Sequence, residues 1–343
     1  MPLEIVQPEA PLAGRQSTFE ASIVIPTHNR RPLLEKALKR LTAQTCDMSR
    51  VEAIVVLDGC TDDTEGMLRS REWPFSVRYI AQEQRGAGAS RNAGARIAQS
   101  PVIIFVDDDI MVAPDFVEQH LRAYEDGTKS VAIGLLAPDP SPKVPGWWRW
   151  VEWQLNKQYR AMEAGRRSVG GRALYSGNFS VRREAFLRVG GFDETLPHSE
   201  DVELGLRLER DGAKFHLALG AKGEHWAHRT YETWLTMAYK YGRWDGALAV
   251  NPQYPFAWEQ LFAAYRRRSL LLRVFAKRVL DHPLLSNWLR RLFRFGSIVA
   301  GALRLSVLER SLYAGLYDLV YWQAVCDELG SARVLWRVLR RRR

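Results

Sequence analysis

Short apolar runs alternate with helical patterns in the first third of the chain. The apolar runs lie at 22–26, 52–57, 77–81 and 102–106. They are nearly continuous, which is typical of strands buried on both faces. Segments 33–41 and 87–98 carry apolar or small residues at helical spacing. This alternation predicts an α/β fold with a Rossmann-like, mostly parallel sheet and helices on both faces. We expect the first strand to stop at Pro26, because proline has no N–H to donate.

The alternation breaks between 138 and 173. Four prolines (Pro138, Pro140, Pro142 and Pro145) precede a tryptophan-rich segment and a basic loop at 165–167. This pattern predicts a mobile or partner-facing insertion. A second ordered block follows, with a strand at 214–219. We therefore divide the chain into an N-terminal arm (1–17), an α/β domain (18–246) and a helical basic C-terminal region (247–343).

The cysteines and the apolar runs of the sequence indicate the cellular compartment. The three cysteines (Cys46, Cys60 and Cys326) are far apart and odd in number. This argues against a disulfide framework and favours a reducing, cytoplasmic compartment. The first residues lack the pattern of a signal peptide, and no apolar run is long enough to predict a transmembrane helix.

The positive charge of the chain indicates anionic molecules as candidate partners. The formal net charge is +10, and much of the excess follows residue 260. Such a basic surface fits phospholipid, nucleic acid or a phosphorylated substrate, or it is simply a set of solvated helix faces. No nucleic-acid-binding motif is present, so we expect no nucleic acid partner.

Three carboxylates follow the most apolar run. In open α/β sheets, ligands bind outside the carboxyl ends of the strands, which is where Asp107, Asp108 and Asp109 stand. Clustered carboxylates repel one another, and a divalent cation is the usual compensation. Oxygen ligands favour Mg²⁺ or Mn²⁺. A helix cap is the alternative for Asp109, but a cap needs one carboxylate rather than three.

Two further segments have the chemistry of a nucleotide site. Asp58 follows the second strand, and Gly59 permits a tight turn there, so Asp58 is a candidate ligand for a base or ribose. The glycine-rich turn at 84–94 opens a helix and offers N–H groups to phosphate or ribose. Its spacing does not match a dinucleotide-binding fingerprint, and close helix packing by small residues is the alternative.

Acidic residues also begin the helix predicted after residue 199. Glu200, Asp201 and Glu203 lie in its first turn. One acid there stabilises the helix dipole, while another is a candidate general base for an acceptor hydroxyl. Helix capping alone explains this segment equally well.

Six segments together resemble one family. They are SIVIPTHNR, VVLDGCTDDT, QRGAGASRNAGARIA, IIFVDDDI, SGNFSVRREAFLRVGGFDE and SEDVELGLRLERDGAKFH. In order and spacing they resemble the family 2 glycosyltransferases of GT-A fold, over about residues 20–245. The resemblance implies an inverting transferase that uses a nucleotide-sugar donor, with uridine or thymidine as the base. Cys60 stands where serine is commoner.

The resemblance also implies roles for individual residues. Asp201, beside Glu200, matches the catalytic base, while Asp109 is the leading metal ligand, with Asp107 and His225 (or His228) as further candidates. Gly177 and Asn178 match the sugar and acceptor pocket. The nucleotide site is implied at Pro26, Thr27, Asn29, Asp58, Gly86, Arg91, Asp107 and Asp108.

The C-terminal region and the reaction leave alternatives open. Basic amphipathic helices such as 287–295 fit contact with an anionic membrane, packing on the catalytic domain, or a homo-oligomer interface. We expect a glycan or lipid-linked acceptor at the inner face of the cytoplasmic membrane. The alternatives are a sugar-phosphate nucleotidyltransferase, which normally has a glycine loop after the first strand, and a non-catalytic nucleotide-sugar-binding or membrane-scaffold protein.

Overall fold

The computed structural model describes residues 4–5, 18–127, 130–138, 144–196, 199–226, 230–252, 254, 257–266, 279–280 and 282–341. Two compact units can be separated: residues 1–141 with 155–227, and residues 142–154 with 228–343. The second unit therefore takes in residues 228–246, which the predicted α/β domain included, together with residues 142–154 of the predicted insertion. The reason is that α8 (Tyr231–Val250) is one continuous helix and packs on α12 (Ser306–Glu328).

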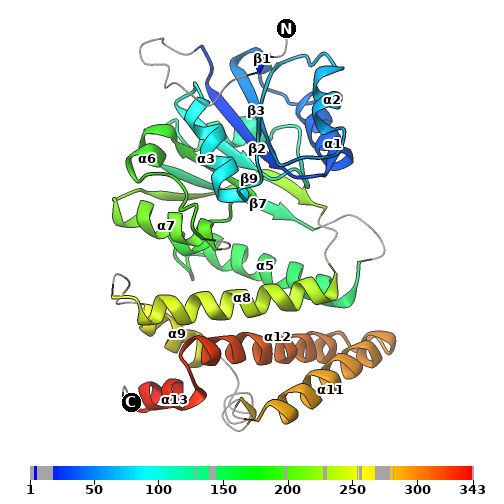
Figure 1. Ribbon diagram of the computed structural model, residues 1–343, viewed down its shortest axis with the longest axis vertical. Coiled ribbons are helices and arrows are strands. Elements are labelled where there is room, and N and C mark those ends of the chain that lie inside the picture. The colour runs from blue at the N-terminus through cyan, green and yellow to red at the C-terminus, as the bar shows by residue number, and fades with distance from the viewer. Residues whose placement is uncertain are drawn as a thin grey trace. The chain divides into compact units, whose positions relative to one another are not determined.

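The first unit is an α/β unit. Its strands are β1 (Glu4–Ile5), β2 (Ala21–Thr27), β3 (Val51–Asp58), β4 (Ser76–Gln82), β5 (Val102–Val106), β6 (Ile110–Val112), β7 (Val131–Ala137), β8 (Asn178–Arg182) and β9 (Phe215–His225). Its helices are α1 (Arg31–Leu41), α2 (Thr64–Arg69), α3 (Ala87–Ile97), α4 (Phe116–Arg122), α6 (Arg183–Arg188) and α7 (Glu200–Arg210). Helix α5 (Gly146–Glu163) has residues in both units. Figure 1 labels most of these elements.

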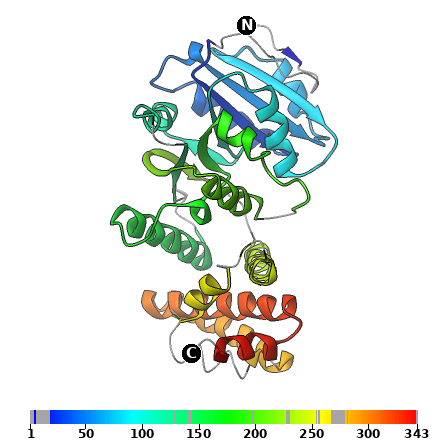
Figure 2. The ribbon, with the colours of Figure 1, turned by 90° about the vertical axis from the view of Figure 1, so that its left-hand side faces the viewer.

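The sheet order explains where a ligand can bind. The strands of the described residues are ordered β1-β4-β3-β2-β5-β8-β7-β9-β6, and Figure 2 shows the blue and cyan strands of this sheet side by side. From β2 the chain proceeds outward to β3 and β4, then returns to the other side of β2 as β5. All neighbours from β1 to β5 are parallel. Chain connections thus diverge between β2 and β5, the switch point at which such sheets bind ligands.

Two apolar cores confirm that both faces of the sheet are covered. Along β3, Val55 and Leu57 belong to one core, whereas Ile54 and Val56 belong to the other. Helices α1, α2 and α4 complete the first core, and α3, α6 and α7 complete the second. This is the arrangement that near-continuous apolar strands predict.

Three local predictions are corrected. Strand β2 continues through Pro26 to Thr27, because β3 pairs with it along its whole length while pairing with β5 ends at Val24. Strand β9 reaches His225, beyond the predicted end at 219, with a register shift after Gly134 of β7. In the predicted loose arm, Glu4–Ile5 pairs with β4, and residues 1–3 and 6–17 lie outside the described residues.

The tryptophan-rich segment is not a mobile insertion. It lies in the first half of α5, and Trp147 and Trp150 are buried. Residues three apart lie on the same side of a helix, and here both rings contact Trp234 of α8. Pro140 and Pro142 lie outside the described residues.

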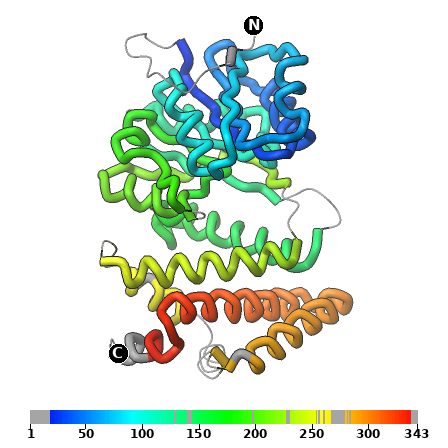
Figure 3. The backbone as a smooth tube through the Cα atoms, viewed as in Figure 1, coloured from blue at the N-terminus to red at the C-terminus, as the bar shows by residue number. Residues whose placement is uncertain are grey.

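The second unit is helical. Besides α8 and α12, its helices within the described residues are α9 (Ala257–Arg266), α11 (Pro283–Ala302) and α13 (Ala332–Arg341), and Figure 3 traces their backbone in yellow to red. Helices α8 and α12 approach closely at Gly242, where a Cβ atom would lie 2.2 Å from the carbonyl oxygen of Tyr321. Among the described residues, no helix is long and apolar enough to cross a membrane.

Candidate active site

The switch point between β2 and β5 holds a carboxylate cluster. Asp108 and Asp109 follow β5 and are buried. The Thr27 hydroxyl, at the end of β2, donates to Asp108 at 2.7 Å. Arg30 donates to Asp108 and Asp109, each at 3.1 Å. The predicted metal and nucleotide residues of these two strands are therefore brought together, and an arginine supplies part of their counter-charge.

Burial changes the chemistry of Asp108. Loss of water around this side chain raises its pKa to about 6, although the Thr27 hydrogen bond and the Arg30 charge favour the ionised form. Arg30 itself is half exposed, and its pKa is raised because the attraction of Asp108 and Asp109 outweighs partial burial.

Arg91 of α3 connects the two acidic segments. Its guanidinium donates to Asp107 at 2.5 Å and to Glu200 at 3.2 Å. Arg91 is buried, and burial alone would lower its pKa, but Asp107 and Glu200 raise it. Arg91 was predicted to approach the base and ribose. Its guanidinium lies between the segment after β5 and the start of α7, and its approach to a nucleotide stays a prediction.

Asp201 lies beside this bridge at the start of α7. Its carboxylate accepts hydrogen bonds from the backbone N–H groups of Val202 (2.8 Å) and Ser176 (3.3 Å). Burial, and then the charge of Glu200, raise its pKa to about 6. A carboxylate with such a pKa is ionised at neutral pH and is a stronger base than an exposed aspartate. Glu203, by contrast, binds Arg207 one turn later in the same helix.

Asp58 organises the glycine-rich turn. Its carboxylate accepts hydrogen bonds from the N–H groups of Arg85 (2.8 Å) and Gly86 (2.9 Å), and from the Gln82 amide at 2.9 Å. Gly86 has a φ of 91°, which glycine adopts without strain. Asp58 therefore fixes the loop at the start of α3, a role that sequence reasoning did not assign.

Other predicted nucleotide residues lie around the same strand ends. Pro26 is part of β2, and Asn29 follows it with a φ of 51°. The Asn29 side-chain oxygen accepts from the N–H groups of Thr61 (2.7 Å) and Asp62 (3.2 Å), which ties the loop after β2 to the loop after β3. In α3, a Cβ on Gly94 would lie 2.5 Å from Val24, so close helix packing accounts for this glycine.

The two predicted sugar-pocket residues differ. Gly177 abuts the cluster, since a Cβ there would lie 2.8 Å from an oxygen of Asp107. Asn178 is fully buried, and its amide bonds His120 at 3.0 Å and the carbonyl groups of Leu135 and Ala221. The Asn178 side chain is thus held by protein partners in the interior, and its place in a sugar pocket stays a prediction.

His120 belongs to this buried network, which the sequence analysis missed. Its two ring nitrogens lie within hydrogen-bond distance of Asn178 and Ser180. Burial lowers its pKa to about 4, so it is neutral at physiological pH. A histidine inside an amphipathic helix gives little sign of such a role in sequence.

Part of the donor set that a hard divalent cation needs is present. One oxygen of Asp109, Oδ1, is buried and accepts no hydrogen bond in the described part of the chain. The Nε2 atom of His225 lies 3.7 Å from it. Five carboxylates gather after β5 and at the start of α7 (Asp107, Asp108, Asp109, Glu200 and Asp201), and two guanidinium groups, those of Arg30 and Arg91, pair with members of this set. A further positive charge would stabilise the site.

No complete metal-binding group is preformed. Within the described ranges, no three His, Cys, Asp or Glu side chains form a group that could hold a metal ion. The carboxylates instead bind Arg30, Arg91 and Thr27. His228 lies outside the described residues.

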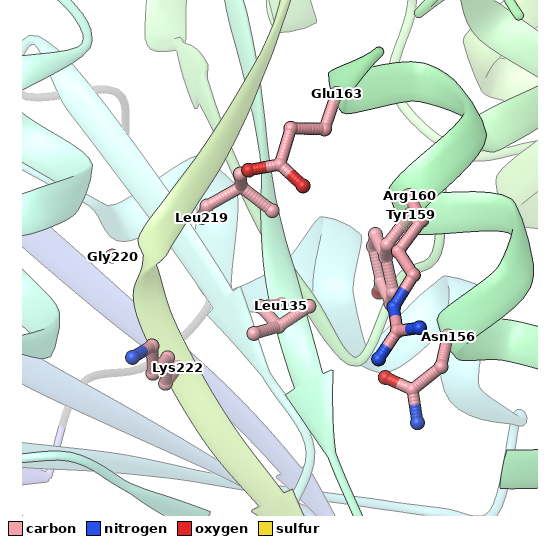
Figure 4. A pocket seen from close by; sticks show the side chains of 8 residues that line it. All are labelled: Leu135, Asn156, Tyr159, Arg160, Glu163, Leu219, Gly220 and Lys222. Carbon is pink, nitrogen blue, oxygen red and sulfur yellow. The ribbon is translucent and has the colours of Figure 1, made fainter. Parts of the chain in front are cut away.

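A separate cavity of about 390 Å³ lies between α5 and strands β7 and β9 (Figure 4). Arg160, Glu163 and Lys222 are among its lining residues, and none of the predicted site residues lines it. Positively and negatively charged side chains both line this cavity, so its charge does not indicate a class of ligand. We therefore assign it none.

The chain is similar in sequence to known proteins. The sequence profile described as "Glycosyl transferase family 2" matches residues 22–190. A validoxylamine A glucosyltransferase of Streptomyces hygroscopicus subsp. jinggangensis is 29% identical over 238 residues, which are 62% of this chain and 56% of that protein. The chain thus spans about half the length of this curated relative.

Two solved structures have a similar fold. The mannosyltransferase PcManGT from Pyrobaculum calidifontis, in complex with GDP-Man and Mn²⁺, aligns with a TM-score of 0.56 at 17% identity, covering 92% of this chain and 91% of that one. S. aureus TarS 1–349 in complex with UDP aligns with a TM-score of 0.51 at 16% identity, covering 91% and 92%. At such identities the likeness concerns the fold. Profile, relatives and fold agree: this chain carries a glycosyltransferase family 2 domain, matched over residues 22–190, and that domain has a GT-A fold.

Proposed function

We propose that this protein is a metal-dependent, inverting glycosyltransferase. In this proposal it moves a sugar from a UDP- or dTDP-sugar to a hydroxyl of a glycan or lipid-linked acceptor, in the synthesis of a cell-surface polysaccharide or glycoconjugate. The observation that carries the proposal is the excess of carboxylates at the switch point, with the buried Oδ1 of Asp109 beside His225. A divalent cation and a nucleoside diphosphate together would satisfy such a site. The solved relative that contains GDP-Man and Mn²⁺ supports this choice.

Separate roles follow for the two acidic segments. Asp109, with Asp107 and His225, would hold Mn²⁺ or Mg²⁺, which when bound offsets the negative charge of the departing diphosphate. Asp108 and Thr27 fix the shape of this end of the sheet. Asp58 orders the turn at Gly86, beside which the base and ribose would lie, with Pro26 and Asn29 at the neighbouring strand ends.

Asp201 is the proposed base. The acceptor oxygen forms a bond to the anomeric carbon while the bond from that carbon to the diphosphate oxygen breaks. The electron pair leaves with the diphosphate, and the acceptor proton passes to Asp201. Arg91 binds Glu200 and so steadies the segment that carries Asp201. Attack from the side opposite the leaving group inverts the anomeric configuration.

We further propose that the protein works in the cytoplasm, at the inner face of the cytoplasmic membrane. The free cysteines fit a reducing compartment. A lipid-linked acceptor would lie at such a surface, and helix α11, described below, is the element suited to meet it.

Turnover tests the proposal directly. With Mn²⁺ present, the purified protein should release UDP or dTDP from a panel of nucleotide sugars, and NMR of the product should give the inverted anomer. Asp109→Ala should abolish the dependence on metal and most of the turnover. Product with retained configuration, or equal turnover by Asp109→Ala, would overturn the mechanism. Nucleotide binding without turnover on any donor would support the non-catalytic alternative.

A further inference from the structure

The helical unit exposes most of the large apolar side chains at the surface of the described residues. Eleven of fourteen such side chains lie between residues 284 and 308. They are Leu284, Leu285, Trp288, Leu292, Phe295, Ile298, Val299, Leu303, Leu305, Val307 and Leu308. We call these side chains the apolar face. Exposed apolar side chains gathered in this way mark an interaction site.

The apolar face follows the geometry of α11. Leu284, Trp288, Leu292 and Phe295 are spaced by three or four residues, so they line one side of the helix. They are exposed by 87, 59, 44 and 67%. The opposite side of α11 is already occupied, since Phe293 packs near Gly315 of α12.

Charge indicates what covers the apolar face. From 282 to 308 the sequence has no Asp or Glu, but it has four arginines: Arg290, Arg291, Arg294 and Arg304. Arg291, Arg294 and Arg304 are exposed. A second copy of this chain, docked face to face, would bring these positive charges together. An anionic surface would pair with them.

The side chains that α11 exposes are typical of a helix that lies along a membrane surface. No described helix is apolar and long enough to span a bilayer. A helix that presents apolar side chains together with arginines, as α11 does with Arg291 and Arg294, lies within the membrane interface. Trp288 has the aromatic ring that is enriched at that level.

We propose that the apolar face docks on a bilayer containing anionic phospholipid. Leu284, Trp288 and Phe295 enter the interface, and Arg291 and Arg304 bind lipid phosphates. The inference does not rest on donor, acceptor or catalysis, because vesicle binding is measured without turnover.

Vesicle flotation of the full chain tests the proposal. The probes are vesicles of phosphatidylcholine alone and of phosphatidylcholine mixed with phosphatidylglycerol. The parent should bind the mixed vesicles, and added salt should weaken binding. The pair Trp288→Ser with Phe295→Ser should reduce binding by about tenfold or more. Arg291→Gln should reduce it about fivefold.

Matched controls separate binding from folding. Leu187→Ser and Val250→Ser remove exposed apolar side chains outside the apolar face, and both should bind like the parent. All variants should unfold at the parent's temperature. Absent binding to mixed vesicles, or unchanged binding by the Trp288/Phe295 pair, would overturn the proposal. A parent dimer that this pair converts to a monomer, without vesicle binding, would assign the apolar face to a second copy instead.

Discussion

The two units differ in which side chains they bury and which they expose. The α/β unit buries charge: Arg91, Asp108 and Asp109 are nearly inaccessible to water. The helical unit exposes apolar surface, with Leu284 at 87% and Phe295 at 67%. Each arrangement is unfavourable in isolation, and in our proposals a ligand of matching chemistry compensates for each. The comparison teaches that buried charged side chains point to a charged ligand, whereas exposed apolar side chains point to an apolar partner.

The largest expected effect concerns Asp201, the proposed base. Asp201→Asn keeps the shape but removes the base, so kcat should fall by about 10³-fold. Progress curves with a fixed donor and acceptor measure it. Glu163→Gln, an exposed acid in the same unit, serves as the matched control and should match the parent. A fall below about tenfold would remove Asp201 from the chemical step.

Arg91 tests whether buried charge is balanced within the α/β unit. Arg91→Met would leave Asp107 and Glu200 without their shared partner, lowering the free energy of unfolding by about 3 kcal/mol. Urea unfolding measures the change. Arg96→Met alters an exposed arginine of the same helix, which lies 3.7 Å from Glu194, and should stay within about 0.5 kcal/mol of the parent. Equal stability of the two variants would contradict the bridging role.

The pH dependence of turnover sharpens the picture of the acidic site. Asp201 must be ionised to accept a proton, and burial raises its pKa to about 6. Activity should therefore be level above about pH 7 and fall about tenfold per unit below pH 6. Asp108 also has a pKa raised to about 6, so the fall steepens if both must be ionised. A profile level down to pH 4.5 would contradict the assignment.

The smallest effect is expected at Arg30, which stands as a half-exposed counter-charge to Asp108 and Asp109. Arg30→Gln should tighten Mn²⁺ binding by up to about fivefold, because exposed ion pairs contribute at most about 1 kcal/mol. Titration followed by electron paramagnetic resonance measures free Mn²⁺. Arg31→Gln removes a neighbouring exposed arginine that pairs with Asp63 and should bind Mn²⁺ like the parent. Weaker binding by Arg30→Gln would mean that Arg30 helps to shape the metal site.

Strands and their polar ends were predictable because each rests on a local pattern. The run at 102–106 is β5 itself, and the aspartates after it lie with Thr27 at one sheet end, as strand order requires. Arg30 was missed because a charged residue in a loop looks solvated until its tertiary partners are known. The buried position of Asn178 was missed because its inward direction depends on the alternation and pairing of β8.

The helical unit was harder to predict, because the burial of its side chains depends on partners that are distant in the sequence. Prolines before Trp147 suggested an interruption, although the spacing of Trp147 and Trp150 was already helical. Their burial depends on Trp234, a residue distant in the sequence. The basic amphipathic pattern at 287–295 was evident in the sequence. Which side of α11 is covered, and which remains exposed, required the contacts with α12.

Thermal unfolding with ligands tests the central claim, that the buried carboxylates bind a cation together with a nucleoside diphosphate. The protein is heated with Mn²⁺ and UDP, dTDP or GDP, and each ligand is also tested without metal. At about 100 times its dissociation constant, a ligand should add about 2.7 kcal/mol of stability. The account predicts a metal-dependent shift with UDP or dTDP that Asp109→Ala loses and the exposed control Asp63→Ala keeps. No shift with any diphosphate, or an equal shift in Asp109→Ala, would contradict it.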